Sequence, residues 1–519
     1  MSENSSKLIL AGGILGLVFL IIFGLFLSDV ELEYIEKEKP KIDEIELPSN
    51  VNQIINALES GKQLYPDWFQ NDIAQVRTGQ ITSKEFLDTY YYLSNQGTIY
   101  APITLWDQLI TAPGFEGRLD DFRVPTPEPI IYDDDYIIEK FVSGLNLPTA
   151  MTFVGEDILV LEKNTGKVIR IQDNGVPYAE PVLDVPVEAA NESGLLGITS
   201  MSNHVFLYFS ESESGFDTLK RHDQPIKNKV YRYDWDGETL TNPLLIKELP
   251  GNLDGKHRHN GGAMATNLND EIYFVIGDLN QHGIFQNIIS SDNIMETGSI
   301  FKVDTQNNNV ELFAMGIRNS FGLAVDPVTG YLWDTENGHT SFDEINLVKS
   351  GFNSGWRLVM GPVDRYNPDI DIEPTLTQTI PSPFENFVYS DPEFSWYKPV
   401  AVTAIEFPDE DSFRKYSDWL FVGDFNNGAI YKFQLNADRT GFVFSNPGLS
   451  DLVGDAKSSA LNFSETLFAR GIQGGVTDIE FHNNAMYVVA IFDGSIYKIH
   501  LTESAKKIEE EKLEIIKKN

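Results

Sequence analysis

The sequence predicts an all-β fold, a six-bladed β-propeller, preceded by one transmembrane helix and a small helical module. One hairpin pattern returns six times between residues 136 and 501. A strand-like segment stands before the first copy and has no hairpin partner of its own. Together these observations predict a closed ring of hairpin-based sheets, and an apolar run near the amino terminus predicts the membrane helix.

Residues 1–28 are expected to form an N-terminal signal anchor. The run from Leu8 to Leu27 has no charged residue. As a helix it would be about 30 Å long, which matches the hydrocarbon core of a bilayer. Lys7 precedes the run and acidic residues follow it, so we expect a single-pass protein whose amino terminus is cytoplasmic and whose remaining chain is extracytoplasmic. No small-residue cleavage site follows Leu27, which argues against a cleaved signal peptide.

Three segments separate this anchor from the propeller. Residues 29–63 are an acidic spacer that could contain a short amphipathic helix around Val51–Leu58. Residues 64–111 carry apolar side chains at helical spacing and are expected to be the small helical module. Residues 112–135 are a linker with several prolines, and its three final aspartates could bind calcium or face solvent.

Residues 136–503 are expected to form the propeller. Each repeat is a short apolar strand, a polar turn with Gly or Asn, and a second strand that alternates apolar residues with Lys or Arg. The copies are 157–171, 204–234, 271–304, 331–348, 419–433 and 485–499. About 60 residues per repeat is enough for a four-stranded blade. The segment 136–142 is expected to complete the last blade, and residues 504–519 form a charged helical tail.

Composition excludes several functions. Asp and Glu number 77 and Lys and Arg 39, so the net charge is −38. Such a surface repels phosphate backbones and anionic lipid headgroups, which argues against nucleic acid as a partner. The chain has no cysteine, so it has no disulfide, thiolate zinc site, iron–sulfur cluster or covalently attached haem.

Three loop motifs could carry chemistry. In HRHNGG (257–262), a histidine between polar residues and glycines could serve as a general base or be a simple loop histidine. In GIRNSFGLAVDP (316–327), Arg318 could act on a ligand or pair with an acidic neighbour. ENGHTSFDEINLV (336–348) offers carboxylates and backbone carbonyls, which calcium prefers, although these side chains could also cap turns.

These motifs in this order resemble the quinoprotein glucose/sorbosone dehydrogenases, propellers that use pyrroloquinoline quinone (PQQ) and calcium. The chain is identified as a membrane-anchored, archaeal-type member of that family. The matching segments are GLNLPTAMTF (144–153), VLDVPVEAANESGLLGI (182–198), HNGG ahead of IYFVIGD, GIRNSFGLAVDPVTGYLWDTENG, and DEINLVKSGFNSGW (343–356). The resemblance covers residues 136–500 and implies oxidation of a sugar or polyol hydroxyl with an external electron acceptor.

The resemblance also implies roles for individual residues. His259 matches the catalytic base, and Arg318 matches the residue that polarises the quinone carbonyl. Glu192 and Asn319 match positions that contact the cofactor.

The same resemblance implies two calcium sites. Gly338 and His339 match the positions whose backbone carbonyls hold a catalytic calcium ion. Asp343 and Glu344 match a second, structural calcium site.

The sequence departs from the family at the expected cofactor site. Arg258 stands where the glucose dehydrogenases have an aspartate before the base. The late-blade segments that supply Lys and Arg to the cofactor's carboxylates read DFNNG (424–428) and GGVTDIEF (474–481), with no basic residue. Arg258 and Arg470 could compensate. The alternative is therefore a catalytically inactive propeller that binds carbohydrate or protein at the cell surface.

Overall fold

The computed structural model describes residues 49–59, 69–83, 86, 90, 129–218, 227–251, 258–267, 269–280, 287, 296–365, 384–408, 413–454 and 465–518. The predicted membrane anchor (1–28), with most of the spacer and of the linker, lies outside these residues. Within the described part of the chain, none of the helices combines the length and the apolar character needed to cross a bilayer. The chain divides into two compact units.

Two short helices precede the propeller in the sequence, and the smaller unit includes the first of them only as far as Ile55. Helix α2 (Ser49–Glu59) buries Val51, Ile55 and Leu58, and α3 (Phe69–Arg77) buries Phe69, Ile73 and Val76. Both sets follow the spacing of one helix face, which is why these segments are helical. Helix α2 confirms the predicted amphipathic helix, and its position shows that helical structure begins before residue 64.

In the described part of the larger unit there are six sheets, each built on four antiparallel strands. The first three are β3–β6 (Pro148–Val154, Asp157–Glu162, Lys167–Ile171, Leu183–Asp184), β7–β10 (Leu195–Met201, His204–Glu211, Lys227–Trp235, Leu240–Pro250) and β11–β14 (Met264–Thr266, Glu271–Ile276, Ser299–Asp304, Asn309–Met315). The next are β15–β16–β17–β20 (Ser320–Val325, Leu332–Glu336, Asp343–Val348, Phe394–Trp396), β21–β22–β23–β25 (Val402–Glu406, Trp419–Asp424, Ile430–Gln434, Leu467–Arg470) and β26–β27–β28–β2 (Val476–His482, Ala485–Ala490, Ser495–Leu501, Tyr136–Ser143).

Short strands extend three of these sheets at their outer edges. Strands β18 (Phe352–Asn353) and β19 (Val388–Tyr389) follow β14, β24 (Val453–Gly454) follows β20, and β1 (Ile130–Ile131) follows β25. Helix α6 (Glu503–Lys518) continues directly from β28, as the sequence predicted. All six predicted hairpins are present as strand pairs.

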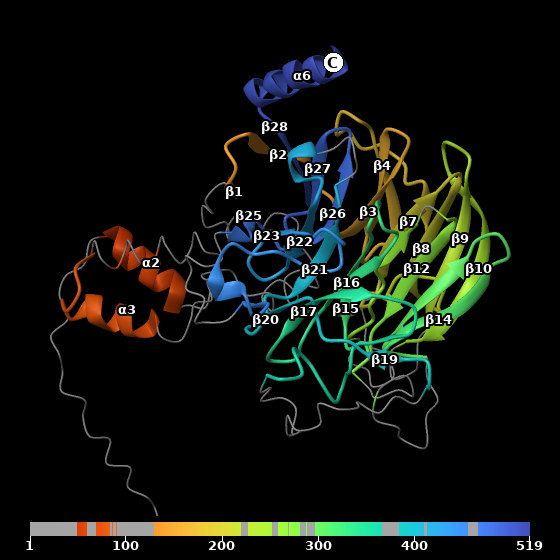
Figure 1. Ribbon diagram of the computed structural model, residues 1–519, viewed down its shortest axis with the longest axis horizontal. Coiled ribbons are helices and arrows are strands. Elements are labelled where there is room, and N and C mark those ends of the chain that lie inside the picture. Colours follow the sequence, from red (N-terminus) through yellow and green to blue (C-terminus); the bar gives the residue numbers. More distant parts are fainter. Residues whose placement is uncertain are drawn as a thin grey trace, which may run out of the picture. The chain divides into compact units, whose positions relative to one another are not determined.

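The last sheet joins the beginning of the propeller to its end. Strand β2 pairs antiparallel with β28, from Tyr136 opposite Leu501 to Ser143 opposite Ser495 (Figure 1). The predicted closing strand is therefore confirmed. The first strands of the six sheets also contact one another in a closed cycle, β3–β7–β11–β15–β21–β26 and back to β3. The all-β propeller fold is confirmed.

The core is divided among the spaces between neighbouring sheets. Each of the six neighbouring pairs encloses its own cluster of buried apolar side chains. Between β20 and β23, for example, the rings of Phe394 and Phe433 lie 4.9 Å apart. Successive side chains along a strand point to opposite faces of its sheet. Because each sheet packs between two neighbours, both of its faces are buried.

Two polar contacts fasten loops to this core. Arg439 forms a buried ion pair with Asp326 at 2.8 Å, which joins the turn after β15 to the loop after β23. Asp133 in the linker accepts hydrogen bonds from Lys415 (3.0 Å) and Tyr416 (2.5 Å), in the short helix η3 (Arg414–Tyr416). At least one linker aspartate is thus used for attachment to the propeller.

Candidate active site

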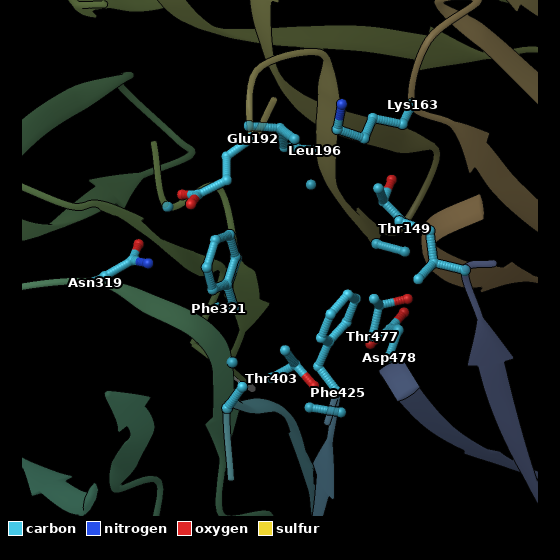
Figure 2. A pocket seen from close by; sticks show the side chains of 18 of the residues that line it. Thr149, Lys163, Glu192, Leu196, Asn319, Phe321, Thr403, Phe425, Thr477 and Asp478 are labelled. Atoms are coloured by element: carbon cyan, nitrogen blue, oxygen red, sulfur yellow. The ribbon is translucent and has the colours of Figure 1, made fainter. Parts of the chain in front are cut away.

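A cavity of about 890 Å³ lies where the inner strands meet. All six of the first strands, β3, β7, β11, β15, β21 and β26, contribute residues to its wall. His259, Arg318, Asn319 and Glu192, far apart in sequence, all line it. Figure 2 shows Glu192, Asn319 and Phe321 on one side of this cavity and Phe425, Thr477 and Asp478 on another. The structure therefore brings the predicted catalytic and cofactor-binding residues together.

His259 is held by a carboxylate that the sequence reasoning did not single out. Its Nδ1 lies 2.6 Å from Oδ1 of Asp278, and both side chains are buried. The same Oδ1 accepts a hydrogen bond from the backbone N–H of Asn280 at 2.8 Å. Because Asp278 is an acceptor, it keeps the imidazole proton on Nδ1 and leaves Nε2 as the nitrogen that can accept a proton.

The same carboxylate connects His259 to Arg318. Oδ2 of Asp278 accepts a hydrogen bond from Nε1 of Trp356 at 2.9 Å. The guanidinium of Arg318 lies over the Trp356 ring, 5.4 Å from its centroid. The backbone carbonyl of Arg318 in turn accepts from the N–H of Asp278 at 2.8 Å. The base and the arginine are thus parts of one packed network.

Glycines make this approach possible. A Cβ on Gly277 would lie 2.4 Å from the carbonyl oxygen of His259 and 2.9 Å from that of Arg318, so no larger residue fits between the two loops. Likewise, a Cβ on Gly197 would lie 1.8 Å from the carbonyl oxygen of Gly262. Gly277 in the EIYFVIGD segment and Gly197 in the GLLG segment therefore allow close loop packing around the site.

Arg318 and Asn319 carry buried polar atoms that the described protein does not satisfy. Nε of Arg318 and Oδ1 of Asn319 have no hydrogen-bond partner among the described residues. Burial lowers the pKa of the Arg318 guanidinium, while the charges of Asp278, Glu336 and Glu192 oppose that shift. Unsatisfied buried atoms are costly, and both residues line the cavity, so a polar ligand there would satisfy them.

Glu192 has a local role as well as a place on the cavity wall. Its Oε2 accepts a hydrogen bond from the backbone N–H of His259 at 2.5 Å. His259 has a positive φ of 57°, a conformation that costs energy in a residue other than glycine. Glu192 therefore helps to hold the base in this conformation.

The residues predicted to bind calcium do not line the cavity. Gly338 and His339 follow Asn337, which lines the cavity, but neither is itself part of the wall. The carboxylate of Asp343 accepts hydrogen bonds from the backbone N–H groups of Gly338 (2.9 Å), Val400 (2.7 Å) and Ala401 (2.6 Å). Burial raises the pKa of Asp343 to about 6, and these hydrogen bonds oppose the rise. Asp343 thus ties loops together.

Glu344 lies on β17, with its carboxylate against Gly361 and Ser354. Burial raises its pKa well above the usual range, and the charge of Glu336 adds to this effect. Among the described residues, no group of three or more His, Asp or Glu side chains is arranged to hold a metal ion.

The β21 and β26 side of the cavity is acidic and aromatic. Phe425, Thr477 and Asp478 lie in the two segments where the family resemblance led us to look for cations. Glu406 and Glu480 line the same side. Arg470 lies on β25, paired with Ile130 in the edge strand β1, so the expectation that it compensates from the cavity was wrong. Arg258 does line the cavity.

Comparison with known proteins identifies the family. The Glucose / Sorbosone dehydrogenase family model matches residues 145–454. The chain belongs to this family. It is 29% identical over 293 residues to quinoprotein glucose dehydrogenase B of Acinetobacter calcoaceticus, covering 50% of this chain and 59% of that relative. It is 24% identical over 333 residues to aldose sugar dehydrogenase YliI of Escherichia coli, covering 58% and 81%.

Solved structures of glucose and aldose sugar dehydrogenases share the fold. A glucose dehydrogenase superimposes with a TM-score of 0.54 at 19% identity, covering 70% of this chain and 99% of that one. The soluble aldose sugar dehydrogenase from Escherichia coli, in its apo-form, gives 0.53 at 18%, covering 71% and 100%. The PQQ-bound aldose sugar dehydrogenase from Streptomyces coelicolor gives 0.50 at 18%, covering 71% and 99%.

The sequence reasoning missed Asp278 and Trp356. Both stand in segments that carried the resemblance, at the end of EIYFVIGD and of GFNSGW. Each directly follows a glycine in a loop, so the backbone conformation of the loop determines where its side chain lies. The hydrophobic periodicity of the sequence does not reveal that conformation.

Proposed function

We propose that this protein is an extracytoplasmic quinoprotein dehydrogenase that oxidises a hydroxyl of a sugar or polyol by hydride transfer to PQQ. The observation that carries the proposal is the shared cavity, where a histidine oriented by Asp278 faces the same space as the unsatisfied atoms of Arg318 and Asn319. Family membership supports the reaction class. We also propose that the six sheets are the six blades of one propeller.

The residues present fit a planar, anionic, carbonyl-bearing cofactor. The cavity volume of about 890 Å³ lies within the usual range for ligand sites, about 300–1,000 Å³. Arg318, Arg258 and Lys163 provide positive charge on its wall. Arg318 and Asn319 would hold the ring, because a donor and an acceptor are both buried there without partners. When bound, PQQ supplies the carbonyl group that accepts the hydride from the sugar carbon.

The protein's own groups handle the proton and the charge. Nε2 of His259 takes the proton of the substrate hydroxyl, and Asp278 stabilises the imidazolium that forms. Arg318 places positive charge where negative charge develops during the transfer. Burial of this network excludes water, which strengthens each of these electrostatic interactions.

The side chains predicted to bind calcium do not form a metal-binding cluster with other His, Asp or Glu side chains among the described residues. Asp343 is engaged by three backbone N–H groups, and Glu344 accepts from Gly361. No step of the proposed reaction is therefore assigned to calcium.

The test is reconstitution of the purified full chain with PQQ, in the presence and absence of Ca²⁺, followed by dye-linked oxidation of a panel of aldoses and polyols. We expect turnover by the wild-type protein and a loss of about 10²–10⁴-fold in His259→Gln. His204→Gln is the matched control, because His204 forms a similar pair with Asp234 (3.0 Å) on β8 and β9, outside the cavity.

The second candidate function is a binding module for carbohydrate or protein. The acidic and aromatic β21–β26 side of the cavity favours it, because a tri-carboxylate cofactor finds no cation there among the residues described. Binding of a sugar without oxidation of any member of the panel would support this alternative. We further propose that an N-terminal helix anchors the protein in the membrane and that an external acceptor reoxidises the cofactor.

A further inference from the structure

Five of the six first strands in the described sheets carry an extra residue where they line the cavity. The pairing register of β3, β7, β15, β21 and β26 shifts by one residue relative to the second strand of each sheet. A β-bulge of this kind redirects the side chain of the extra residue. Figure 2 shows one side chain from each shift around the cavity, and these five are called the bulge residues: Thr149, Leu196, Phe321, Thr403 and Thr477.

Two of the bulge residues connect neighbouring sheets. Oγ1 of Thr149 on β3 donates to the backbone carbonyl of Leu195 on β7 at 2.9 Å. Oγ1 of Thr403 on β21 donates to the backbone carbonyl of Val476 on β26 at 2.6 Å. These hydroxyl protons are used within the protein, so the two threonines serve the assembly of the ring of sheets.

Phe321 is the aromatic bulge residue, and it cannot make such a hydrogen bond. Its side chain is half-buried and lines the cavity. It lies two residues after Asn319, whose Oδ1 is buried without a hydrogen-bond partner among the described residues. A half-buried phenyl ring on a cavity wall keeps part of its apolar surface in water, and a ligand that covers this surface gains free energy.

Phe425 is a second half-buried aromatic residue on the cavity wall, in the turn after β22. The turn is fixed by the carboxylate of Asp424, which accepts hydrogen bonds from the backbone N–H (2.7 Å) and side-chain amide (2.9 Å) of Asn427. The N–H of Phe425 donates to the carbonyl of Ala401 at 2.8 Å. Its ring packs edge-on against that of Phe492, with the centroids 5.6 Å apart. The protein thus holds Phe425 in place before a ligand binds, which lowers the entropic cost of binding.

We infer that Phe321 and Phe425 bind a flat ring of the ligand through contact with their phenyl rings. Figure 2 shows both phenyl rings directed into the open space of the cavity, from different sides. The inference rests on the proposed dehydrogenase function. The flat ring belongs either to the fused quinone of PQQ or to a pyranose, whose C–H groups form an apolar face. Contact with one aromatic ring adds about two- to ten-fold to affinity beyond the burial of its area.

The experiment compares the wild-type full chain with Phe321→Leu, Phe425→Leu and the double variant. Leucine keeps an apolar side chain but removes the flat ring, whereas Phe321→Tyr and Phe425→Tyr keep the ring. Phe313→Leu is the matched control, because Phe313 on β14 is half-buried but does not line the cavity. PQQ binding is titrated by quenching of intrinsic tryptophan fluorescence, and KM is measured for glucose.

The two sources of the ring give different results. A rise of about two- to ten-fold in the PQQ dissociation constant of each leucine variant, larger in the double variant and absent from the tyrosine variants, assigns the contact to the cofactor. The same pattern in KM for glucose, with PQQ binding unchanged, assigns it to the sugar.

Each remaining outcome decides against a claim. If the wild type binds PQQ and oxidises glucose, and the double variant matches it or loses no more than Phe313→Leu, the role of the two phenylalanines is refuted while the proposed function stands. If the wild type neither binds PQQ nor oxidises a sugar, the proposed function fails and the inference falls with it. Thermal melting of each variant shows whether a change reflects loss of folding, and the tyrosine variants keep the comparison informative if a leucine variant is unstable.

Discussion

Replacement of Asp278 by Asn should disable the base with little effect on binding. Three donors converge on this carboxylate: His259 Nδ1 and the N–H of Asn280 on Oδ1, and Trp356 Nε1 on Oδ2. An asparagine has only one oxygen, so at least one of these contacts becomes a clash between two donors. An unsatisfied buried donor costs about 1–3 kcal/mol.

The two orientations of the new amide set the range of the effect. If its oxygen faces His259, the imidazolium formed during the reaction loses a charged partner, and the rate falls by about ten-fold. If its NH₂ group faces His259, the imidazole must accept at Nδ1 and carry its proton on Nε2. The base is then absent, and the rate falls by about 10²–10⁴-fold.

The assay is dye-linked sugar oxidation by the reconstituted full chain, with kcat and KM determined separately. We expect kcat to fall by at least about ten-fold, while KM and the PQQ dissociation constant change by less than about three-fold. Asp234→Asn alters the comparable His204–Asp234 pair on β8 and β9, outside the cavity, and is the control. The reasoning is refuted if Asp278→Asn keeps the wild-type kcat, or if both variants lose activity equally.

Three further predictions concern the network and the fold. Arg439→Ala leaves the buried carboxylate of Asp326 without its ion-pair partner, so the free energy of unfolding, measured in urea, should fall by about 3–5 kcal/mol. The control is Lys415→Ala, which removes a half-exposed ion pair and should lower the free energy of unfolding by less than about 1 kcal/mol. Equal losses in the two variants would contradict this prediction. Burial raises the pKa of Asp424 to about 6, so the unfolded state ionises first as pH rises, and wild-type stability should fall by up to about 3 kcal/mol between about pH 4 and pH 6. Asp424→Asn should make that slope shallower in melts recorded across this range, while other buried carboxyls such as Asp343 keep part of it, and an unchanged slope would count against the assignment. Arg318→Met should weaken PQQ binding and lower kcat together, measured by fluorescence quenching and turnover, whereas a fall in kcat alone would show that Arg318 acts only in the transition state.

The hairpins could be read from the sequence because their signals are local. Alternating residues and a polar turn determine each copy, and each copy appears as a strand pair. The linker aspartates could not be read, because Asp133 meets Lys415 and Tyr416 only after the chain has completed most of the ring. Local pattern determines local structure, whereas contacts over such separations depend on the closed fold.

The site shows the same division. His259 and Arg318 were found through motifs, whereas Asp278 owes its role to the glycine before it. The sequence pointed to Asp343 and Glu344 as possible ligands, but it did not reveal that backbone N–H groups donate to both carboxylates. Two of the N–H groups that donate to Asp343 belong to Val400 and Ala401, in a loop far from Asp343 in the sequence. A motif read along the chain cannot include such donors.

The attachment of the propeller to the chain before it has a mechanical consequence. Among the described residues from 129 onward, tension applied from the amino-terminal side reaches β1 first and then Asp133, which Lys415 and Tyr416 hold. Only after these contacts yield would force reach Tyr136 and begin to open the β2–β28 pair from its end, one residue pair at a time. The linker contacts therefore protect β2, the strand that closes the ring, from tension applied at the amino-terminal side. In a pulling experiment, Asp133→Ala should allow the ring to open at lower force.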